Sequence, residues 1–373
     1  MAVKVTFPHM GQAYLAIKGM LDDLGIEVVI PPPITERTLE IGTKLSPEMA
    51  CLPLKINIGN YIESVEKGAD TIIIAGSCGP CRFGYYGVVQ KEILKDLGYD
   101  VDMIIFDPPD SDYRAFIERI RKLAGKNSWV NIAQAFKRAS IIVKEADEML
   151  DIALRKRARE VNKGDTDSRL YRFEREVWGK YGSQEILETI RKYKGILSQV
   201  EEKPRVSPLK IGLVGEIYTL VEPYVNLHIE KKLGYLGVEV YRSITLHEWV
   251  KVHLSLDVKH RMRHKRILRK AAPYLNLCVG GHAWQTIANS IYYSECGLDG
   301  VIQIMPFGCM PEIVAESILP KVYQDYGTPI MTLVVDEMTG EAGYFTRLEA
   351  FVDLLEQKRR SKADEYKESL FRG

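Results

Sequence analysis

The sequence predicts an α/β protein with two doubly wound parallel-sheet domains and a helical connecting region. Short, continuously apolar runs such as TIIIAG (71–76) are typical of strands buried on both faces of a parallel sheet. These runs alternate with segments of helical periodicity, as expected for strand–helix–strand units. The alternation stops near residue 111 and returns near residue 209, in a chain of 373 residues that is too long for one core.

The first predicted domain covers residues 1–110. Its strands are expected at 3–7, in IEVVI before three prolines, at 71–76 and at 101–106. Helices are expected at 12–24, 53–67 and 87–97. Because each helix joins two apolar runs, the strands should form one parallel sheet covered on both faces.

The helical connecting region covers residues 111–208. Strand patterns are absent from this part of the sequence, and charged helical sequence such as FKRASIIVKEADEML dominates. Its many Lys and Glu residues are most simply explained by solvated helix faces. The segment EEKPRVSP (201–208) is typical of a linker and ends the region.

The second predicted domain covers residues 209–373 and repeats the strand–helix alternation. Thr346 followed by Glu349 has the spacing of a capping box, so the last helix is expected to begin near Arg347. The predicted architecture is therefore of the Rossmann or flavodoxin-like kind, present twice. Strands are expected at 210–216, 238–242, 275–280, 299–305 and 329–335, with helices between them.

Composition and charge narrow the classes of partner. The formal net charge is +1, so no global charge attracts nucleic acid or a membrane surface. No apolar run reaches the roughly 18 residues of a membrane-spanning helix. The first residues lead directly into a strand pattern and lack the layout of a signal peptide. We therefore expect a cytoplasmic protein that binds neither nucleic acid nor membrane.

Four of the six cysteines occupy similar positions, in loops between a strand and a helix or at a helix start. They are Cys51, Cys78, Cys81 and Cys309. Ligands of open α/β sheets bind at the carboxyl ends of the strands, where helix amino termini also converge. Helix dipoles at such positions lower thiol pKa values and favour metal ligation. The four cysteines therefore predict one shared metal or redox site.

The remaining cysteines and the chemistry of the site leave alternatives open. Cys278 lies inside the apolar run LNLCVG and Cys296 at a helix end, and both are predicted to be small buried residues. The Cys-x-x-Cys of Cys78 and Cys81 fits a redox dithiol, half of a zinc site or an iron–sulfur site. Dispersed thiolates without a second close pair favour a cluster, and a structural zinc site is the alternative.

Polar residues near the predicted site have both functional and structural interpretations. Asp336, Glu337 and Glu341 follow the strand at 329–335, where they would act as acid or base, hold a partner or cap helices. His282 is a candidate proton donor or substrate contact, and equally a structural hydrogen-bonding residue. The catalytic candidates are thus His282, Glu337 and Glu341, and the catalytic residues themselves stay unknown.

Basic residues gather in KHRMRHKRILRK (259–270), which contains seven Lys or Arg. This run either docks an acidic partner or phosphate groups, or is an exposed helix face. Arg82 and Tyr85 lie beside Cys81 and are candidates for tuning the charge of a bound cluster. Neither GxxxxGK[ST] nor GxGxxG occurs, so the sequence contains no recognisable phosphate loop.

Several motifs together resemble a known family. ACLPLK, AGSCGPCRFGYYG, VGEIYTLVEPYVN, PFGCMPEIVAESILP and DEMTGEAGYFTRLEAF are similar to segments of the 2-hydroxyacyl-CoA dehydratase superfamily. The nearest branch is that of the acyl-CoA dehydratase activase-related proteins. The resemblance covers residues 1–110 and 210–355, and the helical middle is only weakly matched.

The resemblance implies an oxygen-sensitive iron–sulfur protein of anaerobic metabolism, with a [4Fe–4S] cluster between two α/β domains. The implied ligands are Cys51, Cys78, Cys81 and Cys309. A double-cubane [8Fe–9S] cluster, as in some relatives, would also use Cys278 and Cys296. The implied electron donor is an ATP-hydrolysing activase with its own cluster.

The resemblance also implies a small-molecule substrate such as an acyl-CoA, and a homodimer or a related second subunit. The chain would relay low-potential electrons, as part of a reductase or a dehydratase-like system. If all four loop cysteines bind iron, no iron site is open to substrate, which favours relay over dehydration. A non-catalytic iron–sulfur scaffold or assembly component is the alternative, and whether the chain is an enzyme stays open.

Overall fold

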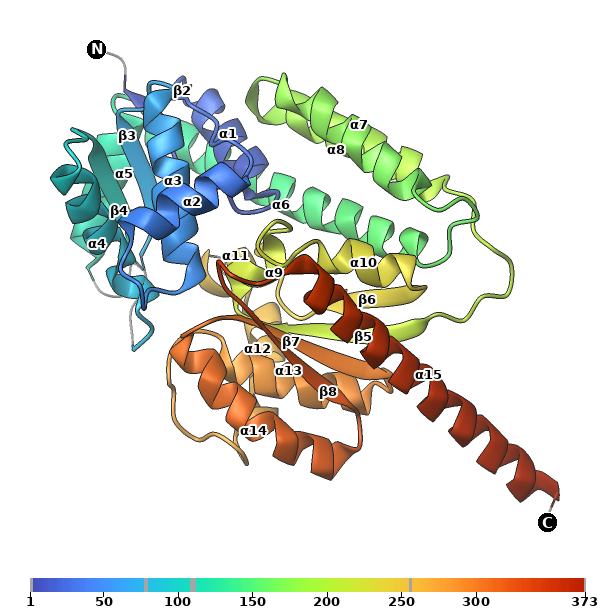
Figure 1. Cartoon of the computed structure of the whole chain (residues 1–373). Helices are drawn as coiled ribbons and strands as arrows, with labels where there is room; N and C mark the ends of the chain where they lie inside the picture. The colour runs from blue at the N-terminus through green and yellow to red at the C-terminus, as the bar shows by residue number, and fades with distance from the viewer. Residues whose placement is uncertain (1–2, 77–79, 108–111, 255–256, 372–373) are drawn as a thin grey trace.

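The computed structural model describes residues 3–76, 80–107, 112–254 and 257–371 (Figure 1). It contains two four-stranded sheets flanked by helices, and all strand pairs within them are parallel. The predicted α/β fold with two doubly wound parallel sheets is therefore confirmed. The two sheets have strand orders β2-β1-β3-β4 and β6-β5-β7-β8, which are the same order shifted by four strands.

The first sheet forms close to the predicted positions. The central strand β3 is buried at four of its five residues, in keeping with its continuous apolar run. Helix α2 was not predicted, because Arg, Lys and Glu interrupt its apolar pattern. The strands are β1 (Lys4–Thr6), β2 (Glu27–Val28), β3 (Thr71–Ala75) and β4 (Asp102–Phe106), and the helices are α1 (Ala13–Asp23), α2 (Glu36–Leu45), α3 (Leu52–Glu66) and α4 (Phe83–Asp96).

The second sheet has a central strand, β7, that is buried along its whole length. Helix α15 begins beside this sheet, and its later turns project away from the body of the molecule (Figure 1). The strands are β5 (Leu209–Gly215), β6 (Val238–Arg242), β7 (Gly300–Pro306) and β8 (Ile330–Val335). The helices are α9 (Ile217–Val221), α10 (Ile229–Tyr235), α11 (Leu246–Leu254), α12 (Val258–Leu268), α13 (Ala283–Glu295), α14 (Met310–Tyr326) and α15 (Glu341–Phe371).

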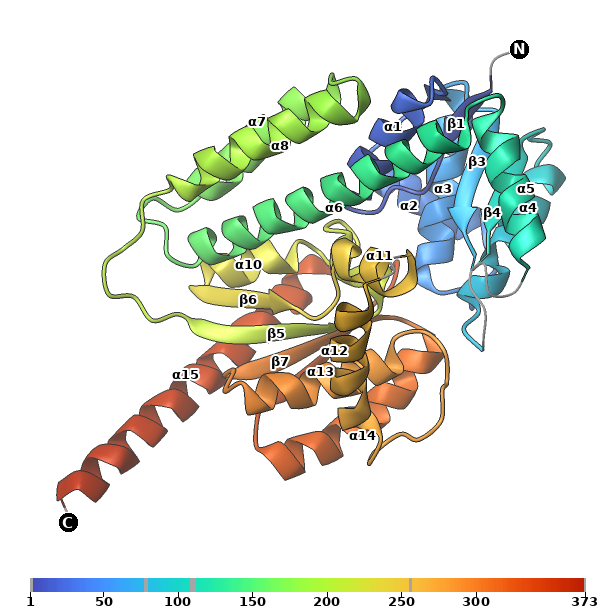
Figure 2. The same cartoon turned by 180° about the vertical axis from the view of Figure 1, so that it is seen from behind.

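The connecting region is helical, as its sequence indicates, but it also packs against both sheets. Its helices are α5 (Tyr113–Ala124), α6 (Trp129–Arg157), α7 (Asp165–Trp178) and α8 (Gly182–Ser198). Ile142 and Met149 of α6 share a core with β1 and α1, while Leu154 joins the core of the second sheet. Figure 2 shows α6 running from one domain to the other. Neither α6 nor any other helix in the described ranges is long and apolar enough to cross a membrane.

Two expectations about the second domain are wrong. The segment 275–280 is a loop and not a strand, because β5 pairs directly with β7 and leaves no place for another strand between them. Helix α15 begins at Glu341, so Thr346 lies inside it, and its hydroxyl donates to the Ala342 carbonyl instead of capping the helix.

Candidate functional site

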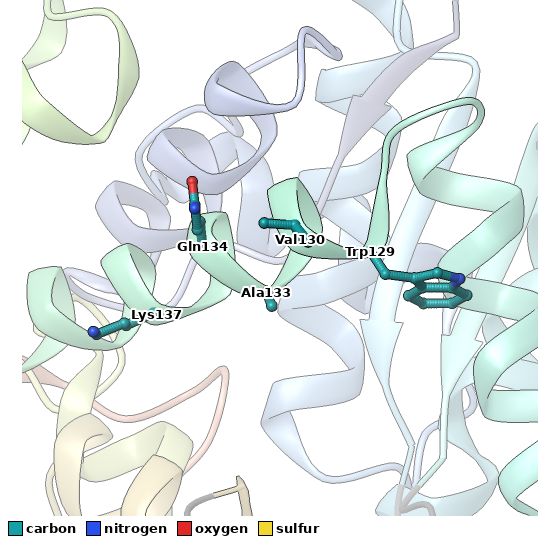
Figure 3. A pocket seen from close by; sticks show the side chains of 5 residues that line it. All are labelled: Trp129, Val130, Ala133, Gln134 and Lys137. Atoms are coloured by element: carbon teal, nitrogen blue, oxygen red, sulfur yellow. The ribbon is translucent and has the colours of Figure 1, made fainter.

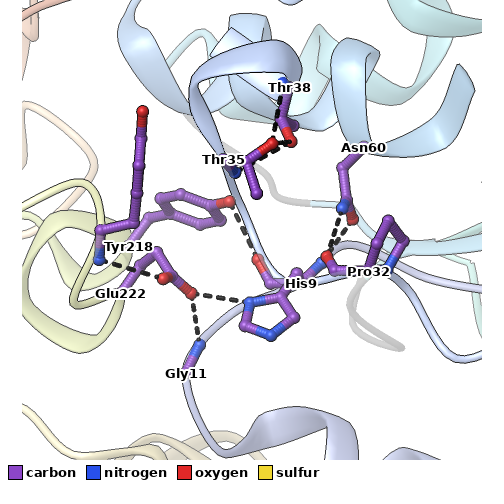
Figure 4. Close-up of polar contacts among 9 residues, drawn as sticks. His9, Gly11, Pro32, Thr35, Thr38, Asn60, Tyr218 and Glu222 are labelled. Atoms are coloured by element: carbon purple, nitrogen blue, oxygen red, sulfur yellow. Dashed lines mark hydrogen bonds and ion pairs between the residues drawn. The ribbon is translucent and has the colours of Figure 1, made fainter. Parts of the chain in front are cut away.

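A buried polar network joins the two α/β domains just beyond β1 and β5 (Figure 4). Nδ1 of His9 lies 2.9 Å from Oε2 of Glu222, and the Gly11 N–H donates to the same oxygen at 2.8 Å. The Tyr218 hydroxyl donates to the His9 carbonyl at 2.9 Å, and the His9 N–H donates to Oδ1 of Asn60 at 3.0 Å. These contacts hold the α9 turn of the second domain against the first domain.

Glu222 is the charged centre of this network. Burial alone would raise the pKa of Glu222, but hydrogen bonds from His9 and the Gly11 N–H hold the pKa below its ordinary value. Gly11 has φ +48°, and a Cβ there would lie 2.4 Å from the Val221 carbonyl oxygen. Only glycine permits this approach of the two backbones.

The described loop cysteines lie at the carboxyl ends of the strands. Cys51 immediately precedes α3, and Cys309 follows β7 and immediately precedes α14. Cys81 follows β3 and lies two residues before α4. Cys81 and Cys309 therefore occupy corresponding positions of the two sheets, and both lie at the edge where such sheets bind ligands.

The three cysteines come close enough to influence one another. Ionisation of Cys81 raises the pKa of Cys51, and ionisation of Cys51 raises the pKa of Cys309, in each case as a minor addition to the effect of burial. Since Cys309 belongs to the second domain and the other two to the first, the cysteines meet between the domains.

Arg82 ties the three cysteine loops together. One terminal nitrogen of its guanidinium donates to the Met49 carbonyl at 2.9 Å, and the other donates to the Gly308 carbonyl at 2.6 Å. Met49 lies two residues before Cys51, and Gly308 directly precedes Cys309. Arg82 therefore positions the loops, in addition to placing a positive charge beside the thiols.

The fourth predicted ligand, Cys78, lies outside the described residues. Among the residues that are described, no three His, Cys, Asp or Glu side chains are arranged to hold a single metal ion.

The thiol pKa values differ from the sequence expectation. Burial raises the pKa of Cys51 to about 11, and burial also raises the pKa values of Cys81 and Cys309. The negative charge of Glu216 adds to each increase. The predicted lowering by helix dipoles is therefore outweighed by burial, and the free thiols are protonated at neutral pH.

Two carboxylates beside the cysteines were missed by the sequence interpretation. Glu216 follows β5 and accepts hydrogen bonds from the Tyr218 and Thr219 N–H groups, both at 2.9 Å. Glu312 lies one turn after Cys309, fully buried, and burial raises its pKa to about 7. The only signal in the sequence is their position: Glu216 directly follows a strand, and Glu312 lies one helical turn after a cysteine.

Glu312 is held by two buried partners from the second domain. It accepts hydrogen bonds from the Thr286 hydroxyl at 3.0 Å and from Nε2 of Gln303 at 2.9 Å. Thr286 lies in the first turn of α13 and Gln303 lies on β7. The carboxylate therefore links the helix and strand that frame Cys309.

The structure separates Cys278 from Cys296. Both are exposed, so the prediction that they are buried core residues is wrong. A Cβ on Gly280 would lie 2.7 Å from the Cys81 nitrogen, and one on Gly281 would lie 3.9 Å from its Sγ. The loop that carries Cys278 thus lies against the site. Cys296 precedes β7 and Cys309 follows it, which places them at opposite ends of a strand roughly 20 Å long.

The predicted acidic candidates have structural partners. Glu337 pairs with the buried Lys55 of α3, so this ion pair crosses between the domains. Glu341 pairs with Lys232 at 2.8 Å and is largely exposed. Asp336 accepts hydrogen bonds from the Met338 N–H and the Thr339 hydroxyl, and these contacts stabilise the turn before α15.

His282 and Tyr85 lie near the site without a defined chemical role. His282 directly precedes α13 and follows Gly281, and its carbonyl accepts from the Thr286 N–H. Tyr85 is exposed. A different tyrosine, Tyr86, contacts the site directly, with its hydroxyl 2.6 Å from Sγ of Cys51.

A shallow apolar pocket of about 390 Å³ lies on α6, and none of the cysteines lines it (Figure 3). Its lining side chains all come from one helix, and no group of converging polar atoms is among them, which is unlike a substrate site. They belong to Trp129, Val130, Ala133, Gln134 and Lys137.

No known protein-family model matches the chain, and no curated protein matches it. The candidate site is therefore defined by its own geometry. Cysteines from both domains, a bridging arginine and two carboxylates surround one region of the domain interface.

Proposed function

We propose that the chain is a cytoplasmic iron–sulfur protein that holds a cluster between its two α/β domains. It would receive low-potential electrons from an ATP-hydrolysing activase and pass them to an acyl-CoA or another small molecule. The observation that carries this proposal is that Arg82, next to Cys81, donates to the Met49 carbonyl near Cys51 and to the Gly308 carbonyl beside Cys309, which brings the three cysteine loops together across the domains. The motifs similar to those of the 2-hydroxyacyl-CoA dehydratase superfamily contain these same cysteines.

The residues fit a [4Fe–4S] cluster held by Cys51, Cys81 and Cys309, with Cys78 as the fourth ligand. Such a cluster supplies one-electron transfer at low potential. Gly281 lies beside this site, because a Cβ there would be 3.9 Å from Sγ of Cys81. A six-thiolate double cubane has less support, because Cys296 lies at the far end of β7.

The surrounding residues would adjust the electrostatics of the site. Burial raises the pKa of Glu216; when ionised, this carboxylate near all three thiols would favour the more positive, oxidised state and lower the reduction potential. Arg82 offsets part of this charge and holds the loops in place. Burial of Cys309 limits the access of water.

The direct test is the iron and acid-labile sulfide content of the anaerobically purified protein, with an EPR spectrum after dithionite reduction. We expect about four irons and four sulfides per chain. Colourless protein with one zinc, or little iron after reconstitution, would contradict the proposal. About eight irons would instead support the double cubane.

A further inference from the structure

Helix α12 and the 3-10 turn that follows it, Arg269–Ala271, have one buried face and one basic face. Ile267 and Leu268 pack into the core formed with α13 and α14. The cations on the other side are exposed. At 100° per residue, most of them lie along one stripe of the helix surface, together with the exposed Met262. They are Lys259, Arg261, Arg263, Lys265, Arg266 and Arg269.

These six cations lack carboxylate partners among the described residues. The ion pairs of this segment involve only Lys270 with Glu295 at 2.5 Å and His260 with Glu248 at 2.9 Å. In a chain of net charge +1, this basic face is a local concentration of charge. It spans about 16 Å along the helix, which is longer than one phosphate group requires.

The basic face belongs to the same part of the second domain as the cysteine site. Helix α12 packs on α13 (Figure 2). The loop between the 3-10 turn and α13 contacts Cys81 through Gly280. The cysteine loops and their neighbours also expose large apolar side chains. These are Met49, Tyr85, Leu277, Phe307 and Met338.

We propose that the basic face of α12, together with these apolar side chains, docks an acidic electron-donor protein. This inference rests on the proposed function and names the charge of the partner. Protein interfaces combine an apolar centre with a polar rim, and opposite charges accelerate and orient the encounter. A nucleic acid fits less well because the α12 face carries no aromatic side chain for stacking. A membrane fits less well because Ile267 and Leu268 face the core.

The test uses a plant-type [2Fe–2S] ferredoxin as an acidic protein probe of this surface, in place of the ATP-hydrolysing donor of the proposed function. Its binding to the full-length protein is measured by calorimetry. The test variant is Arg263→Glu/Arg266→Glu/Arg269→Glu. The matched control is Lys126→Glu/Lys137→Glu/Arg172→Glu, which reverses three exposed cations elsewhere and changes the net charge equally. Circular dichroism checks that both variants fold.

We expect the affinity to fall about tenfold in the test variant and less than twofold in the control. The affinity of the wild type should also fall as NaCl rises from about 50 to about 300 mM. Equal effects in the two variants, or no salt dependence, would overturn the docking surface. So would tighter binding of phosphatidylserine vesicles or single-stranded RNA than of ferredoxin. If binding is lost only in the test variant but the protein never loads iron, the result supports the docking surface and rejects the proposed function.

Discussion

The two α/β domains have the same strand order but use their cysteines differently. Cys81 and Cys309 follow corresponding strands, β3 and β7. Cys51 and Cys278 precede the corresponding helices, α3 and α13. Cys51 is half-buried behind Tyr86, whereas Cys278 is exposed on a glycine-containing loop. The comparison shows that the shared topology places cysteines at corresponding positions of the two domains. Local packing then determines whether each thiol is buried or exposed.

The largest expected effect comes from breaking the contact between the domains. Glu222→Ala would leave His9 and the Gly11 N–H without their buried acceptor, at a cost of about 3 kcal/mol in the free energy of unfolding. Iron loading should fall as well, because the two halves of the site would separate. Urea unfolding and iron content measure the two effects, with the exposed Glu188→Ala as control.

The same carboxylate predicts a pH dependence. The pKa of Glu222 is lowered in the folded state, so its contribution to stability is present above its ordinary pKa and is lost as pH falls through the folded value. Wild type and Glu222→Ala should therefore differ less in stability at about pH 3 than at pH 7. A difference that does not shrink in acid would contradict the ionised role of Glu222.

The next effect concerns Gly281, which lies against Pro311 and beside Cys81. A Cβ on Gly281 would lie 2.8 Å from Pro311, whereas one on Gly297 would meet nothing within 4 Å. Both have positive φ, so alanine at either costs about 1 kcal/mol in stability, and Gly281→Ala costs more because its Cβ would press on Pro311. Only Gly281→Ala should also reduce iron content, by about half or more. Equal iron in both variants would show that Gly281 is not part of the site.

A smaller effect is expected from Glu312, measured on the iron-free protein. Because burial raises its pKa to about 7, the folded state binds more protons than the unfolded state between about pH 4.5 and 7. The stability of the wild type should therefore fall as pH rises through this range, by about 1–3 kcal/mol relative to Glu312→Gln. Parallel pH profiles of the two proteins would contradict the raised pKa.

The smallest effect concerns the two exposed thiols of the second domain. Cys278→Ser should alter the EPR line shape, or speed iron loss to a chelator by about tenfold, because its loop lies against Cys81. Cys296→Ser should leave both unchanged, since Cys296 lies at the opposite end of β7. Identical behaviour of the two variants would mean that Cys278 has no role at the site.

The sequence predicted the sheets well because buried parallel strands leave continuous apolar runs. It failed at 275–280, where LNLCVG has the composition of a strand but no neighbour with which to pair. It also could not reveal Glu222, whose partners His9 and Gly11 are more than 200 residues away in the chain. Raised thiol pKa values were missed for the same reason, since burial depends on tertiary packing and not on local pattern.

The central claim is that cysteines of both domains hold one cluster. Iron content after anaerobic reconstitution of Cys51→Ser, Cys309→Ser and Cys296→Ser tests this claim most directly, with circular dichroism to verify folding. We predict that the first two variants each lose most of their iron and that Cys296→Ser retains the wild-type amount. Full iron in either Cys51→Ser or Cys309→Ser would contradict a site shared between the domains.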